Sequence, residues 1–124
     1  MTASIRIPTF DADIILIHDV GRDYVKRYAQ RKFGCQIEKL YDEFSGLTVD
    51  ADNMTWIVYI PDTQLGDFVW LVKTLSHEAN HVTLQMMRKI GVQDDETMCY
   101  CQDNLLGEML KKVMKKGKRP SRKQ

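Results

Sequence analysis

The sequence lacks the features of a membrane-spanning, secreted or disulfide-bonded protein. No apolar run approaches the roughly 20 residues that a transmembrane helix needs. Residues 1–6 lack the basic start and the apolar core of a secretory signal. The three cysteines are an odd number, and Cys99 and Cys101 lie too close together to pair with each other. We therefore expect reduced thiols and a cytoplasmic location, without membrane contact.

The size and composition are those of one ordinary globular domain. The chain has 124 residues, of which 44% are hydrophobic and 28% are charged. A chain of this length can bury a core without disulfides, and no internal repeat is visible. We therefore expect a single domain over residues 1–113.

The positive charge is concentrated at the C-terminus. Residues 111–124 hold eight of the 18 bases and no acid, so the first 110 residues hold ten bases against 17 acids, a net charge of −7. Blocks of like charge are usually solvated, so we expect residues 114–124 to be a basic, disordered tail. Such cations can neutralise phosphates, which makes residues 111–124 a candidate for nonspecific contact with nucleic acid, although a protein partner fits them equally.

Three segments in the first half predict secondary structure. Asp13–His18 is a short apolar run rich in β-branched residues, which predicts a buried strand. Asp23–Phe33 has helical spacing of its tyrosines and ends before Gly34. Residues 46–60 predict a hairpin, in which Met54, Trp56, Val58 and Ile60 share one face of the second strand.

The second half predicts two helices. The first runs from about Gln64 to Ile90, capped by Asp62 or Thr63 and stopped by Gly91. The second opens at Asp94 or Asp95, runs through Val113 and is closed by Gly117 and Pro120. Together these patterns predict an α+β fold, with a small antiparallel or mixed sheet packed on the long helix.

The long helix contains the motif His77-Glu78-Ala79-Asn80-His81. Residues four apart face the same side of a helix, so both imidazoles can bind one zinc ion. Glu78 follows the first ligand directly and can act as a general base on a water molecule. Such a motif arises by accident in well under about 1% of chains of this length, so we favour a metal site over two solvated histidines.

A catalytic zinc needs a third protein ligand, and its fourth position is kept for water. Because the loop after Gly91 lets the chain fold back, we expect Glu96, in the first turn of the last helix, to be that ligand. Tyr100 and Asp103 would share its side of the helix and can support the ligand or the oxyanion. The alternatives for the third ligand are Asp94, Asp95, Cys99, Cys101, Asp103, Glu108 and His18.

Two further residues have two readings each. His18 ends an apolar strand and is better explained as a buried, hydrogen-bonded histidine than as a ligand. Arg88 lies two turns beyond His81 on nearly the same face and can stabilise an oxyanion or a substrate carboxylate, but a solvated charge is the simpler reading.

The segment 75–81, followed after a spacer by residues 94–100, resembles the gluzincin metallopeptidases. In particular it resembles their minimal single-domain forms and the short phage and prophage proteins that carry this motif. The resemblance covers residues 54–110. It implies a zincin-like fold with one Zn²⁺, with His77 and His81 as ligands, Glu78 as general base and Glu96 as third ligand. It also implies that Met54–Ile60 is the strand along which substrate peptides lie.

One position departs from that family, because many gluzincins place an aspartate four residues after the ligand glutamate and this chain has Tyr100 there. The identity of the residues that support the third ligand is therefore not fixed by the resemblance.

The preferred function is a zinc-dependent peptidase that is encoded by a bacteriophage or prophage and located in the cytoplasm of the bacterial host. A second hypothesis is a viral accessory protein that keeps zinc for stability or for a protein partner and cleaves nothing. A third is a DNA-associated protease tethered through its basic tail.

Overall fold

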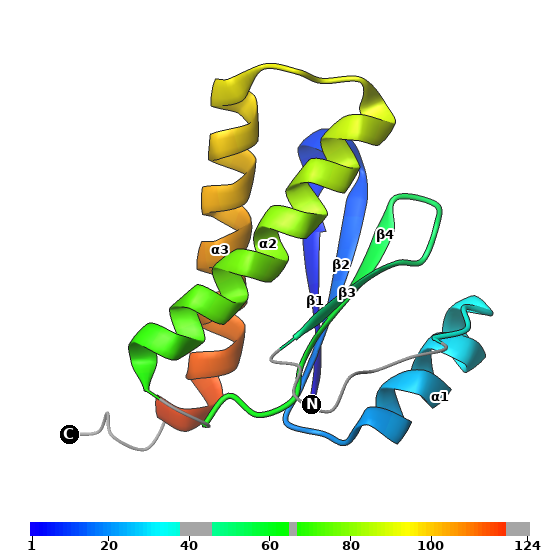
Figure 1. Ribbon diagram of the computed structural model, residues 1–124, viewed down its shortest axis with the longest axis vertical. Coiled ribbons are helices and arrows are strands. Elements are labelled where there is room, and N and C mark those ends of the chain that lie inside the picture. Colours follow the sequence, from blue (N-terminus) through cyan, green and yellow to red (C-terminus); the bar gives the residue numbers. More distant parts are fainter. Residues whose placement is uncertain (38–45, 65–66, 119–124) are drawn as a thin grey trace.

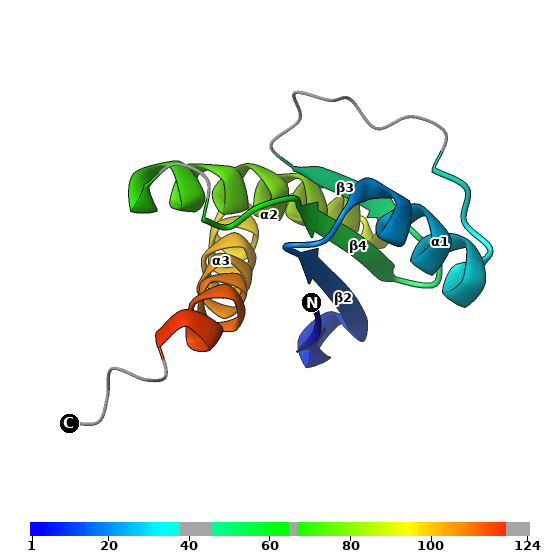
Figure 2. The ribbon, with the colours of Figure 1, turned by 90° about the horizontal axis from the view of Figure 1, so that it is seen from below.

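The computed structural model describes residues 1–37, 46–64 and 67–118, with side chains to Met114. They form an α+β fold in which helices cover both faces of a four-stranded mixed sheet (Figures 1 and 2). In chain order the elements are β1 (Thr2–Ile7), a 3₁₀ turn (Pro8–Phe10), β2 (Ala12–His18), α1 (Arg22–Phe33), β3 (Leu47–Asp50), β4 (Thr55–Ile60), α2 (Phe68–Ile90) and α3 (Asp95–Lys118).

The strands lie in the order β1-β2-β4-β3. β1 pairs antiparallel with β2, β2 pairs parallel with β4, and β3 pairs antiparallel with β4. Within the described residues, β1 and β3 are therefore the two edges of the sheet, and β4 has a partner on each side.

Two apolar clusters fill the two faces of the sheet. On one face, Trp56, Val58 and Ile60 pack with the apolar sides of α2 and α3, with Met54 partly buried against them. This confirms the predicted alternation along the hairpin. On the other face, Ile57 and Tyr59 pack with residues of α1. The central strand β4 is thus buried on both sides.

The structure confirms the predicted strand in β2, the helix in α1 with its end before Gly34, and the hairpin in β3 and β4. Strand β1 was not predicted. Its signal was present in the sequence, because apolar Ala3, Ile5 and Ile7 alternate with polar residues. In the structure these three are more buried than the residues between them.

The predicted start of the long helix is wrong. Helix α2 begins at Phe68, and the Asp67 side chain caps it by accepting a hydrogen bond from the Trp70 N–H at 2.8 Å. Asp62 instead closes a short turn, accepting the Gln64 N–H at 2.8 Å. Gly91 ends α2 with a left-handed φ of 76°, as predicted.

Helix α3 starts where predicted and ends later. Asp94 accepts the Thr97 N–H at 2.9 Å before the helix begins at Asp95. The helix continues to Lys118, because Gly117 lowers the helix propensity at that position without ending the helix. Met114 still packs against the core, so the expected tail is helical at first. Residues 119–124, with Pro120, lie outside the described residues.

A polar network joins the end of β2 to the approach to α2. His18 is buried, and its Nδ1 lies 2.5 Å from Asp19 Oδ2, which confirms a hydrogen-bonded histidine. The same carboxylate accepts the Thr63 N–H at 2.8 Å. Burial favours a raised pKa for Asp19, but the hydrogen bonds from His18 and Thr63 outweigh it and lower that pKa.

No helix in the described part of the chain combines the length and the apolarity that crossing a bilayer requires.

Candidate metal centre on helix α2

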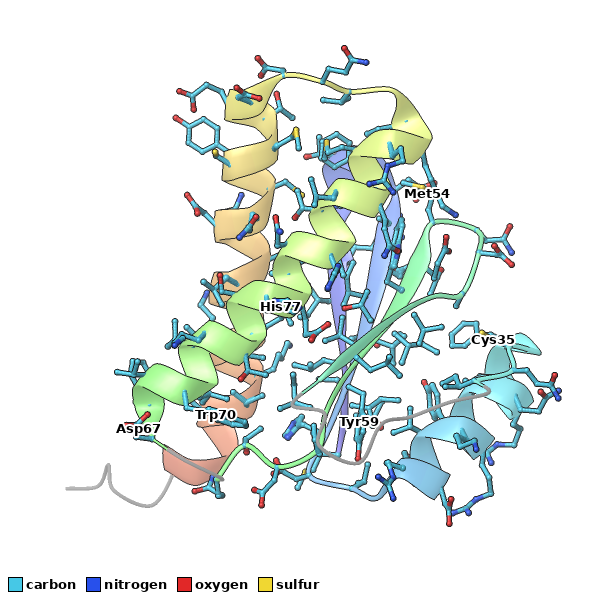
Figure 3. The ribbon with its side chains drawn as sticks, viewed as in Figure 1. Cys35, Met54, Tyr59, Asp67, Trp70 and His77 are labelled. Atoms are coloured by element: carbon cyan, nitrogen blue, oxygen red, sulfur yellow. The ribbon has the colours of Figure 1, made fainter. Side chains whose placement is uncertain are left out.

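Two imidazoles meet on the exposed side of α2. His77 lies about midway along the helix (Figure 3), and His81 follows one turn later. Both residues are exposed, and their rings stand at 83° to each other with centroids 4.7 Å apart. The two Nε2 atoms approach to 3.1 Å. The predicted pairing of the imidazoles is therefore present.

This pair fits a zinc ion. Zinc–nitrogen bonds of 2.0–2.1 Å at a tetrahedral angle require the two nitrogens to be about 3.3 Å apart. The distance of 3.1 Å is close to that value. The alternative is a direct hydrogen bond between two neutral rings, which needs one ring to donate from Nε2 and the other to accept. A metal requires both Nε2 atoms to be unprotonated.

Glu78 points away from solvent. Only 4% of the residue is exposed, although it lies on the same helical turn as the exposed imidazoles. The Thr48 hydroxyl on β3 donates a hydrogen bond to Glu78 Oε1 at 2.6 Å. Acidic residues are almost never buried without a partner, and this one has a hydroxyl rather than a cation. The carboxylate is therefore held at the boundary between α2 and the edge strand.

Gly46 passes directly over this carboxylate. A Cβ atom at position 46 would lie 2.7 Å from Glu78 Oε2 and 3.1 Å from Glu78 Cδ. A side chain at position 46 would force the Glu78 carboxylate to shift, so glycine allows the backbone before β3 to approach the acid in its present position. Sequence reasoning missed both Gly46 and Thr48 as parts of the site. A glycine opening a hairpin strand was the only signal.

Contacts near the hairpin turn hold β3 and β4 against α2. The Trp56 indole N–H donates to Gln85 Oε1 at 2.9 Å, and Lys89 Nζ lies 2.8 Å from Asp50 Oδ2. The Lys89 ammonium also lies 5.5 Å from the centroid of the Trp56 ring. These contacts fix the position of Thr48 relative to Glu78.

The structure does not bring Glu96 to the imidazole pair. The described residues contain no group of three or more His, Cys, Asp or Glu side chains that could hold a metal ion. Glu96 is exposed in the first turn of α3, beside the end of α2. From His81 to Ile90 is nine residues, or about 14 Å along the helix axis.

Helix α3 also packs on the wrong side of α2 for this role. It returns antiparallel along α2 (Figure 1), and the Thr83 hydroxyl lies 4.0 Å from Cys101 Sγ. Position 83 is about 200° around the helix from position 81. Burial raises the pKa of the Cys101 thiol, which disfavours the thiolate that a metal needs. The other predicted alternatives for the third ligand on α3 also belong to the helix that packs on the Thr83 side of α2. They are Asp95, Cys99, Asp103 and Glu108.

The remaining predicted residues are dispersed. Tyr100 is 66% exposed and lines a cleft of about 330 Å³ between β1, the 3₁₀ turn and α3. Asp103 is exposed on α3. Arg88 is exposed on α2, seven residues or about 10 Å beyond His81. Of these three, only Arg88 shares the helix that carries the imidazoles.

The strand expected to receive a substrate is also corrected. Within Met54–Ile60, strand β4 pairs on both sides, with β2 and with β3, so its backbone cannot accept a further strand. The edge strand nearest to Glu78 is β3, which carries Thr48.

Comparisons with protein-family models, with curated proteins and with solved structures give no match. The resemblance to gluzincins therefore depends on the motif itself.

Proposed function

We propose that this protein is a zinc-dependent metallopeptidase with a zincin-like arrangement of sheet and active-site helix. His77 and His81 are the zinc ligands and Glu78 is the general base. The observation that carries the proposal is a buried carboxylate on the same helical turn as two exposed imidazoles whose Nε2 atoms are 3.1 Å apart. A purely structural helix has no need of an acid on its buried side.

Bound zinc would polarise the scissile carbonyl and make an attacking water more acidic. The residues of the chain supply the proton transfers. Glu78 takes a proton from the attacking water and passes it to the leaving amine. Thr48 holds Oε1 by its hydrogen bond, and the missing side chain at Gly46 leaves space beside Oε2.

The position of β3 at an edge of the described sheet supports a peptide as the class of substrate. A free strand edge can add an extended peptide through main-chain hydrogen bonds. Thr48 ties this edge to Glu78, so a peptide aligned on β3 would lie beside the general base. We assign substrate alignment to Leu47–Asp50 and not to Met54–Ile60.

We do not assign the third zinc ligand to Glu96, because α3 carries it away from the imidazole pair. Two imidazoles leave two tetrahedral positions for further ligands and water. Arg88 is the one predicted auxiliary residue that remains on the same helix.

The second candidate function is a non-catalytic zinc protein, encoded by a phage or prophage, that acts through a protein partner. The exposure of both imidazoles favours it, because an open metal site can be completed by a ligand from another molecule.

A peptide-library digest separates the two functions. We expect cleavage products from the purified chain with zinc, their loss on adding a chelator, and their return on adding zinc again, with products identified by mass spectrometry. A zinc-loaded protein that yields no product from the library would favour the non-catalytic function.

Removing the Thr48 hydroxyl is expected to lower kcat with little change in KM. In Thr48→Val the Glu78 carboxylate keeps its packing but loses its hydrogen bond. Because hydrogen bonds to charged groups are the stronger ones, we expect a loss of about tenfold or more in kcat, measured on the best library peptide.

Thr48→Ser restores the hydroxyl and should recover most of the rate. Equal rates for Thr48→Val and Thr48→Ser would show that Thr48 does not position Glu78.

A further inference from the structure

Helix α1 carries a concentration of positive charge in an otherwise acidic body. The first 110 residues hold ten bases, and half of them fall within the twelve residues of α1. The helix has one acid, Asp23. Its five bases are Arg22, Lys26, Arg27, Arg31 and Lys32.

Part of this charge lines a surface hollow of about 690 Å³. Among the described residues its lining consists of three cations, two amides and one apolar residue, without a carboxylate: Lys26, Arg27, Arg31, Gln30, Gln36 and Ile37. The four residues from α1 fall at positions i, i+1, i+4 and i+5, which share one side of a helix. The opposite side, with Val25 and Ala29, is buried against the sheet.

Helix stability explains only part of this charge, because Arg31 and Lys32 lie in the last turn, where the helix dipole favours cations, and Asp23 precedes Arg27 by four residues. Arg27 and Arg31 are like charges four residues apart, a spacing that destabilises a helix. None of the ion pairs among the described residues involves Lys26, Arg27 or Arg31. Three cations without an ion pair among the described residues, gathered around one hollow, point to an anionic ligand.

We propose that this face of α1 binds the sugar–phosphate backbone of nucleic acid without reading its sequence. Arginine forks bind phosphate oxygens with two parallel hydrogen bonds, and lysine supplies a point charge. Glutamine side chains are common partners of phosphate and sugar oxygens. The hollow is open, so it can follow a repeating backbone.

Other anions fit this surface less well. A helix that binds a membrane surface inserts its apolar side, whereas the apolar side of α1 is packed on the sheet. The site is also separate from the imidazole pair, because α1 and α2 cover opposite faces of the sheet (Figure 2). The proposal therefore stands independently of zinc or peptidase activity.

The test measures binding of a short fluorescein-labelled duplex DNA to the full chain by anisotropy, between about 50 and 200 mM salt. Each phosphate contact contributes about 0.9 to the steepness of a plot of log affinity against log salt. The triple variant Lys26→Gln/Arg27→Gln/Arg31→Gln loses three contacts, so we expect its slope to be less steep by about 2.7. The affinity at the lowest salt should fall at least about tenfold.

The matched control removes three cations elsewhere, in Arg6→Gln/Lys73→Gln/Lys89→Gln, and leaves both α1 and the basic residues 111–124 unchanged. It should keep the slope of the unchanged protein. Equal losses in both triple variants would overturn the assignment to α1. Binding of polyglutamate or of phosphatidylserine vesicles as tight as that of DNA would overturn the assignment to nucleic acid. Unfolding curves of each variant verify that the fold is retained.

Discussion

Replacing Glu78 with glutamine is expected to remove most peptide hydrolysis while leaving zinc bound. Glutamine has nearly the same shape, so it still fits beneath Gly46 and its amide oxygen still accepts the Thr48 hydrogen bond. It cannot take a proton at neutral pH, and general-base catalysis contributes about 10²–10⁴-fold to a rate. We therefore expect kcat/KM to fall by about that factor.

The fold of this variant should be at least as stable as that of the unchanged protein. Glu78 is 4% exposed, and removing a charge from such a site removes a desolvation cost. Thermal unfolding and zinc content, measured on the same preparation, separate loss of chemistry from loss of structure. Asp23→Asn, a neutralised acid on the distant helix α1, is the matched control and should keep full activity. Undiminished hydrolysis by Glu78→Gln would remove Glu78 from the mechanism.

The local structure of this chain was predictable because it depends on short-range periodicity. The apolar run in β2, the alternation of Trp56, Val58 and Ile60 and the stop at Gly91 each report on a few neighbouring residues. The imidazole pair belongs to the same class, since an i, i+4 spacing on a helix fixes which side chains meet. The predicted helix start was wrong because two acids and a threonine, Asp62, Asp67 and Thr63, compete as caps, and Asp67 makes the hydrogen bond to the helix N–H.

The arrangement between elements was not predictable from those patterns. A helical stripe says which residues are buried but not which neighbour covers them. The sequence therefore could not reveal that α3 packs on the Thr83 side of α2, which separates Glu96 from His81. Alternation along β4 does not indicate whether that strand is central or at an edge. For this reason β3, an edge strand of the described sheet, was not recognised as the partner of Glu78.

Removing either imidazole is expected to abolish tight zinc binding. In His77→Ala or His81→Ala the remaining ring has no neighbour at the 3.1 Å separation that suits one ion. Losing a group that merely supports a ligand weakens metal affinity by 10–100-fold, so losing a ligand should weaken it by at least about 100-fold. Zinc competition with a chromophoric chelator measures the affinity directly.

Asn80→Ala is the matched control for this measurement. Asn80 is exposed and lies on the same helix between the two histidines, so its loss changes neither ring. Zinc should raise the unfolding temperature of the unchanged protein and of Asn80→Ala, because a ligand that binds only the folded state stabilises it. It should not do so in either histidine variant. If all four proteins bound zinc equally, the close approach of the two rings would be a hydrogen bond between imidazoles, and the metal would have to be held by other residues.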